Sequence, residues 1–143
     1  MKRKIRNAVI AFFVIIVMVV IVMLLNPLRR SEEKIRESIL ELTPIGTSME
    51  DVVKVVENNE KWEIRSVRAT GYLLINGEPS FPYVSPIAES NYEYEHPIIG
   101  EKSIRVHLGE YRTVFAVDVS AYFGFDEDSK LIDIAVIKDM DAM

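Results

Sequence analysis

The sequence contains no cysteine and only two histidines, and no acidic residue precedes position 31. Without cysteine the chain can form no disulfide, no Cys-ligated zinc site and no iron–sulfur cluster, and no thiol can act as a nucleophile or carry a lipid. Two histidines are too few for a His-rich metal site. We therefore expect neither a cofactor nor a metal ion.

Charge divides the 143 residues into a basic head and an acidic body. All six charged residues among the first 30 are Lys or Arg, whereas the remaining 113 residues include eleven basic and 22 acidic ones, a net charge of −11. An acidic body argues against nucleic acid as a partner, because binding phosphate requires a basic face.

An unbroken apolar run covers residues 8–25 and contains no polar residue, glycine or proline. At ~1.5 Å per residue the run extends roughly 27 Å, close to the hydrocarbon thickness of a bilayer. A buried core helix of this length normally has a polar stripe. The run also exceeds the apolar core of a cleaved signal peptide, and no small-residue cleavage site follows it. The sequence therefore predicts an uncleaved transmembrane signal anchor, with the lipid bilayer as the partner of residues 8–25.

The charges that flank the apolar run predict its orientation. Four basic residues precede the run, against Arg29 and Arg30 directly after it, and segments rich in Lys and Arg stay in the cytoplasm. We therefore expect a cytoplasmic basic tail over residues 1–7, the anchor over 8–25 and an extracytoplasmic domain over 31–143. The expected localisation is that of a single-pass protein of the cell membrane.

The body of the chain shows helical periodicity first and strand periodicity afterwards. Residues 31–42 and 47–57 each place apolar side chains on one helical face, and Ser31 and Thr47 stand where helix N-caps are expected. Later segments alternate apolar and polar residues, most clearly over residues 113–125. This order predicts an α+β fold in which two helices pack on one face of a three- or four-stranded antiparallel sheet.

Residues 76–100 interrupt the alternation and predict a long loop. They hold four of the six prolines, which are excluded from central strands, together with an acidic and aromatic stretch. Loops of this length are usually functional or disordered, and tyrosine is enriched at binding hot spots. A solvated loop without a partner is the alternative interpretation. The candidate partner-binding residues are Phe81, Tyr83, Glu89, Tyr92, Glu93, Tyr94 and Glu95.

No pattern in the sequence points to catalysis. His107 alternates with Val106 and Leu108 and is expected to face outward on a strand, while His96 lies in the Pro-rich loop. The sequence contains no Gly-x-Ser-x-Gly nucleophile elbow and no Gly-rich phosphate-binding motif. The acidic residues 126–128 lack the glycine and the distal acid of an EF-hand loop, so they predict a hairpin turn. We expect no catalytic residue.

Short motifs within residues 31–138 resemble the SmpA/OmlA lipoprotein family, whose members have the BamE-like fold. The motifs are Pro44-Ile-Gly46-Thr-Ser-Met-Glu-Asp-Val-Val53 and Phe125-Asp126-Glu-Asp-Ser-Lys-Leu131. The resemblance implies an extracytoplasmic, membrane-tethered adaptor that binds another protein. The chain departs from the family in two respects: the lipobox cysteine is missing, with the apolar run in its place, and the loop over residues 76–100 is longer than expected.

Taken together, these features predict a membrane-anchored, extracytoplasmic protein-binding module of the cell envelope that is not an enzyme. Two other classes of function are left open. One is a domain that inhibits an enzyme or confers immunity to it, and the other is an envelope hydrolase or enzyme accessory that uses loop carboxylates. A cleft with paired, buried carboxylates would favour the enzyme, whereas an exposed aromatic patch would favour the adaptor.

Overall fold

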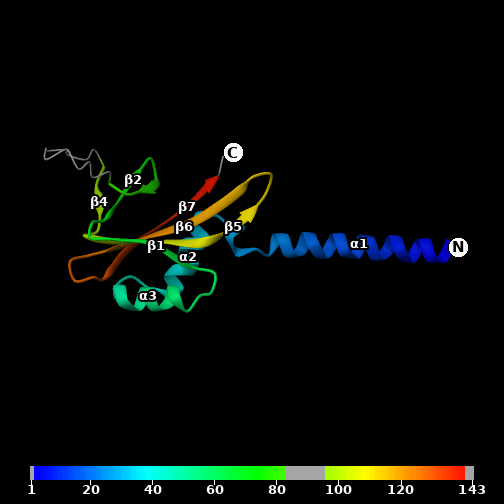
Figure 1. Cartoon of the computed structure of the whole chain (residues 1–143), viewed down its shortest axis with the longest axis horizontal. Helices are drawn as coiled ribbons and strands as arrows, with labels where there is room; N and C mark the ends of the chain where they lie inside the picture. Colours follow the sequence, from blue (N-terminus) through cyan, green and yellow to red (C-terminus); the bar gives the residue numbers. More distant parts are fainter. Residues whose placement is uncertain (1, 83–95, 141–143) are drawn as a thin grey trace.

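The computed structural model describes residues 2–82 and 96–140. Within these ranges three α-helices and one short 3-10 helix come first, and seven strands follow in two antiparallel sheets (Figure 1). The helices are α1 (Lys2–Leu24), η1 (Pro27–Arg29), α2 (Glu32–Leu42) and α3 (Met49–Glu57). The strands are β1 (Glu63–Arg68), β2 (Tyr72–Ile75), β3 (Glu78–Ser80), β4 (Ile98–Ile99), β5 (Lys102–Arg112), β6 (Ala116–Phe125) and β7 (Leu131–Met140).

Helix α1 projects away from the rest of the molecule as a separate rod (Figure 1). Its large apolar side chains from Val9 to Ile21 are between 41% and 67% exposed, and none of them belongs to the buried core. After α1, the Asn26 carboxamide accepts a hydrogen bond from the Leu28 amide at 3.0 Å and caps η1. Leu28 then packs against the core, so the globular part begins at η1.

The predicted transmembrane signal anchor over residues 8–25 is wrong. Among the described residues, no helix combines the length and the apolar composition needed to cross a membrane. The same finding contradicts the predicted localisation as a single-pass protein of the cell membrane.

The large sheet has the strand order β1-β5-β6-β7, and each neighbouring pair is antiparallel. Alternation along β6 gives one fully buried row of side chains and an opposite row that includes Asp118 and Tyr122. The buried row shares one core with residues of β5 and β7 and of helices α2 and α3. The members from the helices are Ile35, Ile39, Val52 and Val56.

The small sheet has the order β3-β2-β4 and lies on the other side of the large sheet from α3 (Figure 1). Asn76 and Gly77 connect β2 to β3 with positive φ angles of 55° and 88°, as a type I′ hairpin turn requires. Because Gly124 of β6 has no side chain, the small sheet can approach the backbone of β6 closely. A Cβ atom at Gly124 would lie 3.1 Å from Cε1 of Tyr72 and 3.2 Å from the carbonyl oxygen of Ile99.

The predicted arrangement of two helices on a single three- or four-stranded sheet is therefore wrong. Part of the predicted loop over residues 76–100 supplies strands β3 and β4, which join β2 in a second sheet. Pro79 is tolerated in a strand because β3 is an edge strand of that sheet. At an edge the missing N–H of proline breaks no ladder hydrogen bond.

Helix α3 provides a direct test of the core. Val52 is fully buried, whereas its neighbour Val53 is only half-buried. Val52→Asp should lower the free energy of unfolding by about 3–5 kcal/mol, because it buries a charge without a partner. Val53→Asp, the matched control, should cost clearly less. Urea denaturation of both variants measures the difference, and equal costs would contradict the packing of α3 described here.

Candidate functional site

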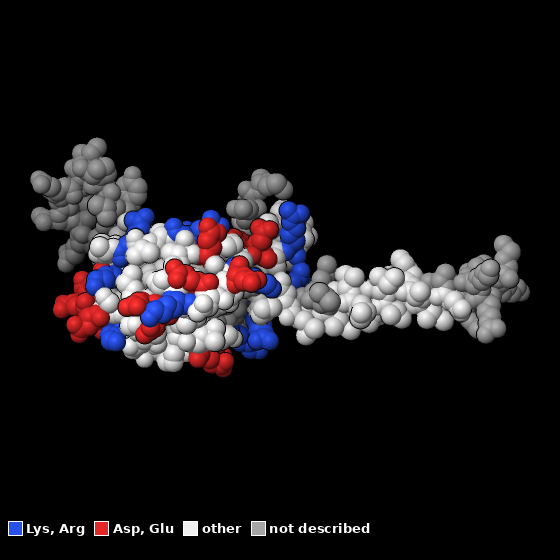
Figure 2. Space-filling view, turned by 60° about the horizontal axis from the view of Figure 1, so that its bottom comes forward, with Lys and Arg blue, Asp and Glu red and all other residues white. Residues whose placement is uncertain are grey.

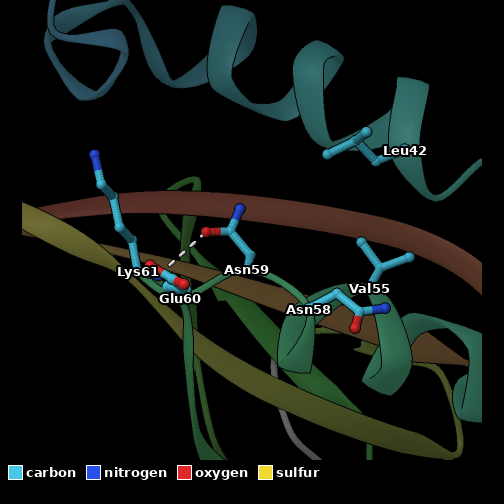
Figure 3. Close-up of a pocket in the computed structure, with 6 residues that line it drawn as sticks. All are labelled: Leu42, Val55, Asn58, Asn59, Glu60 and Lys61. Atoms are coloured by element: carbon cyan, nitrogen blue, oxygen red, sulfur yellow. Dashed lines mark hydrogen bonds between the residues drawn. The ribbon is translucent and has the colours of Figure 1, made fainter.

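An open groove lies between the C-terminal ends of α2 and α3, and we call it the interhelical groove (Figure 3). Figure 3 shows Leu42 on α2 and Val55 on α3 across the groove from each other, with polar side chains on the segment that follows α3. The groove has a volume of about 620 Å³. Its lining residues are Leu42, Val55, Asn58, Asn59, Glu60 and Lys61.

Leu42 is the last residue of α2, and its side chain is 56% exposed. The helix ends at the buried Thr43, whose hydroxyl and amide both donate to the Ile39 carbonyl, at 3.0 and 2.8 Å. Leu42 also lines a second, smaller hollow of about 120 Å³ that is mostly apolar and includes Leu28 and Trp62. The exposed apolar side chain of Leu42 therefore lines both of these adjoining hollows.

The segment after α3 is held in place by hydrogen bonds. The Asn59 carboxamide accepts from the Lys61 amide at 3.2 Å (Figure 3). The Asn58 amide donates to the Lys54 carbonyl and the Trp62 amide donates to the Asn59 carbonyl, each at 3.0 Å. These bonds fix the polar side of the interhelical groove before any ligand is present.

A polar cluster lies on the outer face of the large sheet, away from the helices. Nδ1 of His107 is 2.5 Å from Oδ1 of Asp118, and the Ser120 hydroxyl donates to Oδ2 of the same carboxylate at 3.1 Å. Arg105 donates to the Ser120 oxygen at 3.4 Å. Because Ser120 donates to the carboxylate and not to the imidazole, the cluster lacks the nucleophile–base pair that an activated serine requires.

Aromatic rings and guanidinium groups join the small sheet to this outer face. The guanidinium of Arg68 lies 4.4 Å from the centre of the Phe81 ring, and the Phe81 and Tyr122 rings are 5.1 Å apart. Arg105 lies 5.5 Å from the centre of the Tyr122 ring. Burial raises the pKa of the Tyr122 hydroxyl, although the nearby Arg105 opposes this effect. The stacked groups contribute cation–π and ring–ring contacts to the docking of the small sheet.

A third polar group, which we call the Asp133 latch, consists of Arg36, Tyr72 and Asp133. The Tyr72 hydroxyl donates to Oδ2 of Asp133 at 2.8 Å, and Arg36 donates to Oδ1 at 2.9 Å. The hydrogen bond with Asp133 raises the pKa of Arg36, against the effect of desolvation. Burial, followed by the hydrogen bond to Asp133, raises the pKa of Tyr72 well above its ordinary value.

Only Phe81 among the predicted partner-binding residues lies within the described ranges. Its half-buried ring packs between Arg68 and Tyr122, so the ring serves contacts within the domain. The other six fall within residues 83–95, outside the described residues, and their role stays a prediction. They are Tyr83, Glu89, Tyr92, Glu93, Tyr94 and Glu95.

The sequence patterns did not predict the interhelical groove. Periodicity placed Leu42 on the core face of α2 together with Ile35 and Ile39, but only those two residues are buried. One feature of the sequence could have indicated that Leu42 is exposed. Leu42 directly precedes Thr43 and Pro44, where the helix is expected to end.

Comparison with known protein families, with curated proteins and with solved structures finds no match for this chain. The function must therefore be argued from the geometry of its own residues.

The Asp133 latch predicts a pH dependence of stability at alkaline pH. The pKa of Tyr72 is raised in the folded state, so the folded protein keeps this proton when the unfolded chain has released it. Stability from this group should be complete below about pH 10 and should decrease as the pH rises further. Tyr72→Phe should make that decrease less steep and cost about 1 kcal/mol at neutral pH.

Urea denaturation between pH 7 and pH 11 measures both effects. Tyr111→Phe, which removes a hydroxyl from another part of the sheet, is the control for the cost at neutral pH. An alkaline slope unchanged by Tyr72→Phe would show that the buried phenol does not resist ionisation.

Proposed function

We propose that this chain is a non-catalytic protein-binding module whose interhelical groove receives an apolar side chain from a basic partner protein. The observation that carries the proposal is the exposure of Leu42 between two adjoining hollows. Interface hot spots cluster in well-packed, desolvated pockets, surrounded by contacts that contribute little energy but exclude water. Leu42 and Val55, with the polar side chains of residues 58–61 beside them, offer this arrangement.

The charge of the domain supports a basic partner. Residues 31–143 carry a net charge of −11, and Figure 2 shows acidic side chains gathered at the end of the molecule away from α1. One hollow at the turn between β6 and β7 is lined by Glu101, Asp126, Glu127 and Asp128. Such a field raises the rate of association with a basic surface and makes it sensitive to salt.

The polar cluster of the outer face supports the absence of catalysis. His107 and Ser120 both bond to the carboxylate of Asp118, so neither is placed to activate the other. The resemblance to the BamE-like family also implies protein binding, and it stays a prediction.

Leu42→Asp should abolish capture of the partner by in-cell crosslinking followed by mass spectrometry. The change places a charge where the partner's apolar side chain is expected to lie, and burying that charge is costly. The melting temperature should stay within about 3 °C of wild type, because Leu42 is exposed at the end of a helix.

The matched control is Val114→Asp, which introduces the same charge at a fully exposed apolar residue in the turn between β5 and β6. This variant should capture the same proteins as wild type. Capture by Leu42→Asp at the wild-type level would reject the interhelical groove as the binding site.

A further inference from the structure

The two edge strands of the large sheet, β1 and β7, differ in how their backbone groups are satisfied. On β7, Nε of Arg36 donates to the Ile134 carbonyl at 2.7 Å, and the Lys138 amide donates to the Glu32 carboxylate at 3.1 Å. Within residues 2–82 and 96–140, the backbone of β1 pairs only with β5. An edge of unpaired N–H and C=O groups is a template for another strand.

The side chains of β1 alternate between the face of the large sheet that carries the helices and its outer face. The register with β5 places Ile64 and Val67 opposite buried core residues, on the face that carries the helices. Val67 is nevertheless 56% exposed. Arg68 lies on the outer face, where its guanidinium contacts the Phe81 ring. A strand added beside β1 would cover Val67 on one face and meet Arg68 on the other.

Strand β1 forms a basic strip in an acidic domain. Arg65 and Arg68 stand against the single acid Glu63, a net charge of +1. Arg65 and Glu63 are 3.2 Å apart, but both are more than half exposed, and such pairs contribute little. In the described part of the chain no acidic group lies within ion-pair distance of Arg68. The strip is therefore complementary to an acidic segment.

The shape of β1 argues for a flexible segment and against a second preformed sheet. A bulge between Ile64 and Ser66 interrupts the register with β5. Bulges increase local twist and bend the strand, so the straight edge of a second sheet fits poorly beside β1. A single extended peptide can follow this twist.

We propose that β1 accepts an acidic, extended segment of a bound protein as a fifth strand of the large sheet. This inference rests on the proposed protein-binding function but concerns a different surface from the interhelical groove. Backbone hydrogen bonds along the edge supply affinity, and the basic strip selects acidic side chains.

The test uses the full chain in a mild detergent, because the described side chains of α1 are apolar and exposed. Two capped peptides of eight residues are compared by calorimetry, one alternating Glu and Val and the other alternating Lys and Val. The Glu peptide should bind at least about tenfold more tightly, because opposite charges then face Arg65 and Arg68. Methylation of alternate backbone nitrogens on the edge-facing side should abolish binding, since it removes the donors that pair with β1.

Charge reversal on β1 tests the selectivity. Arg65→Glu combined with Arg68→Glu should reverse the preference in favour of the Lys peptide, and Arg65→Glu alone should reduce it without disturbing the contact of Arg68 with Phe81. The matched control, Lys34→Glu combined with Lys130→Glu, makes the same change of charge at exposed positions away from β1. It should leave the preference unchanged.

Three results would overturn the proposal. They are failure of both peptides to bind, equal binding of the methylated peptide, and self-association that depends on Arg65 and Arg68, which would make a second copy the occupant. Leu42→Asp should bind the Glu peptide like wild type. If Leu42→Asp abolishes capture of the cellular partner but neither peptide binds to the wild-type protein, the result would reject strand addition and leave the interhelical groove as the proposed binding site.

Discussion

The carboxylate of Asp133 bonds to two parts of the chain that are distant from it in sequence. It lies on β7, accepts a hydrogen bond from Tyr72 of β2 and forms an ion pair with Arg36 of α2. Its side chain is 30% exposed, so these bonds are partly shielded from water and stronger than those of a surface pair. The small sheet consists of strands of two to four residues, which are too short to be stable without packing on another layer.

The latch also positions the surfaces that are proposed to bind a partner. By holding α2 against β7, Arg36 sets the direction of a helix whose last residue, Leu42, lies at the interhelical groove. The same guanidinium donates a hydrogen bond to the Ile134 carbonyl, so this acceptor on the edge of β7 is no longer available to another strand. None of these latch contacts involves the lining of the interhelical groove or strand β1.

Local sequence patterns predicted the elements of the domain better than their arrangement. Helices expected over residues 31–42 and 47–57 are observed as Glu32–Leu42 and Met49–Glu57, because amphipathic periodicity and capping residues act within one or two turns. The second cap was assigned one residue too early. The Ser48 hydroxyl, not that of Thr47, accepts from the Asp51 amide, while Thr47 donates to the Pro44 carbonyl.

Local sequence patterns did not predict the small sheet or the Asp133 latch. The dipeptide Asn76-Gly77 is a strong hairpin signal, but the strands beside it have only four and three residues and one contains Pro79. The partners of Asp133 are 61 and 97 positions away along the chain, so no local period connects them. Leu42 fits the apolar period of α2, and only the tertiary arrangement leaves it exposed.

Hydrogen exchange of Asp133→Asn tests most directly whether one carboxylate joins α2 and the small sheet. The amide keeps the size of the side chain but removes the charge that pairs with Arg36 and one strong acceptor. Exchange in both Glu32–Leu42 and Tyr72–Ser80 should become at least about tenfold faster than in wild type, a change equivalent to ~1.4 kcal/mol of local stability, while β5 and β6 change less. Faster exchange confined to β7, with α2 and the small sheet unchanged, would contradict the account.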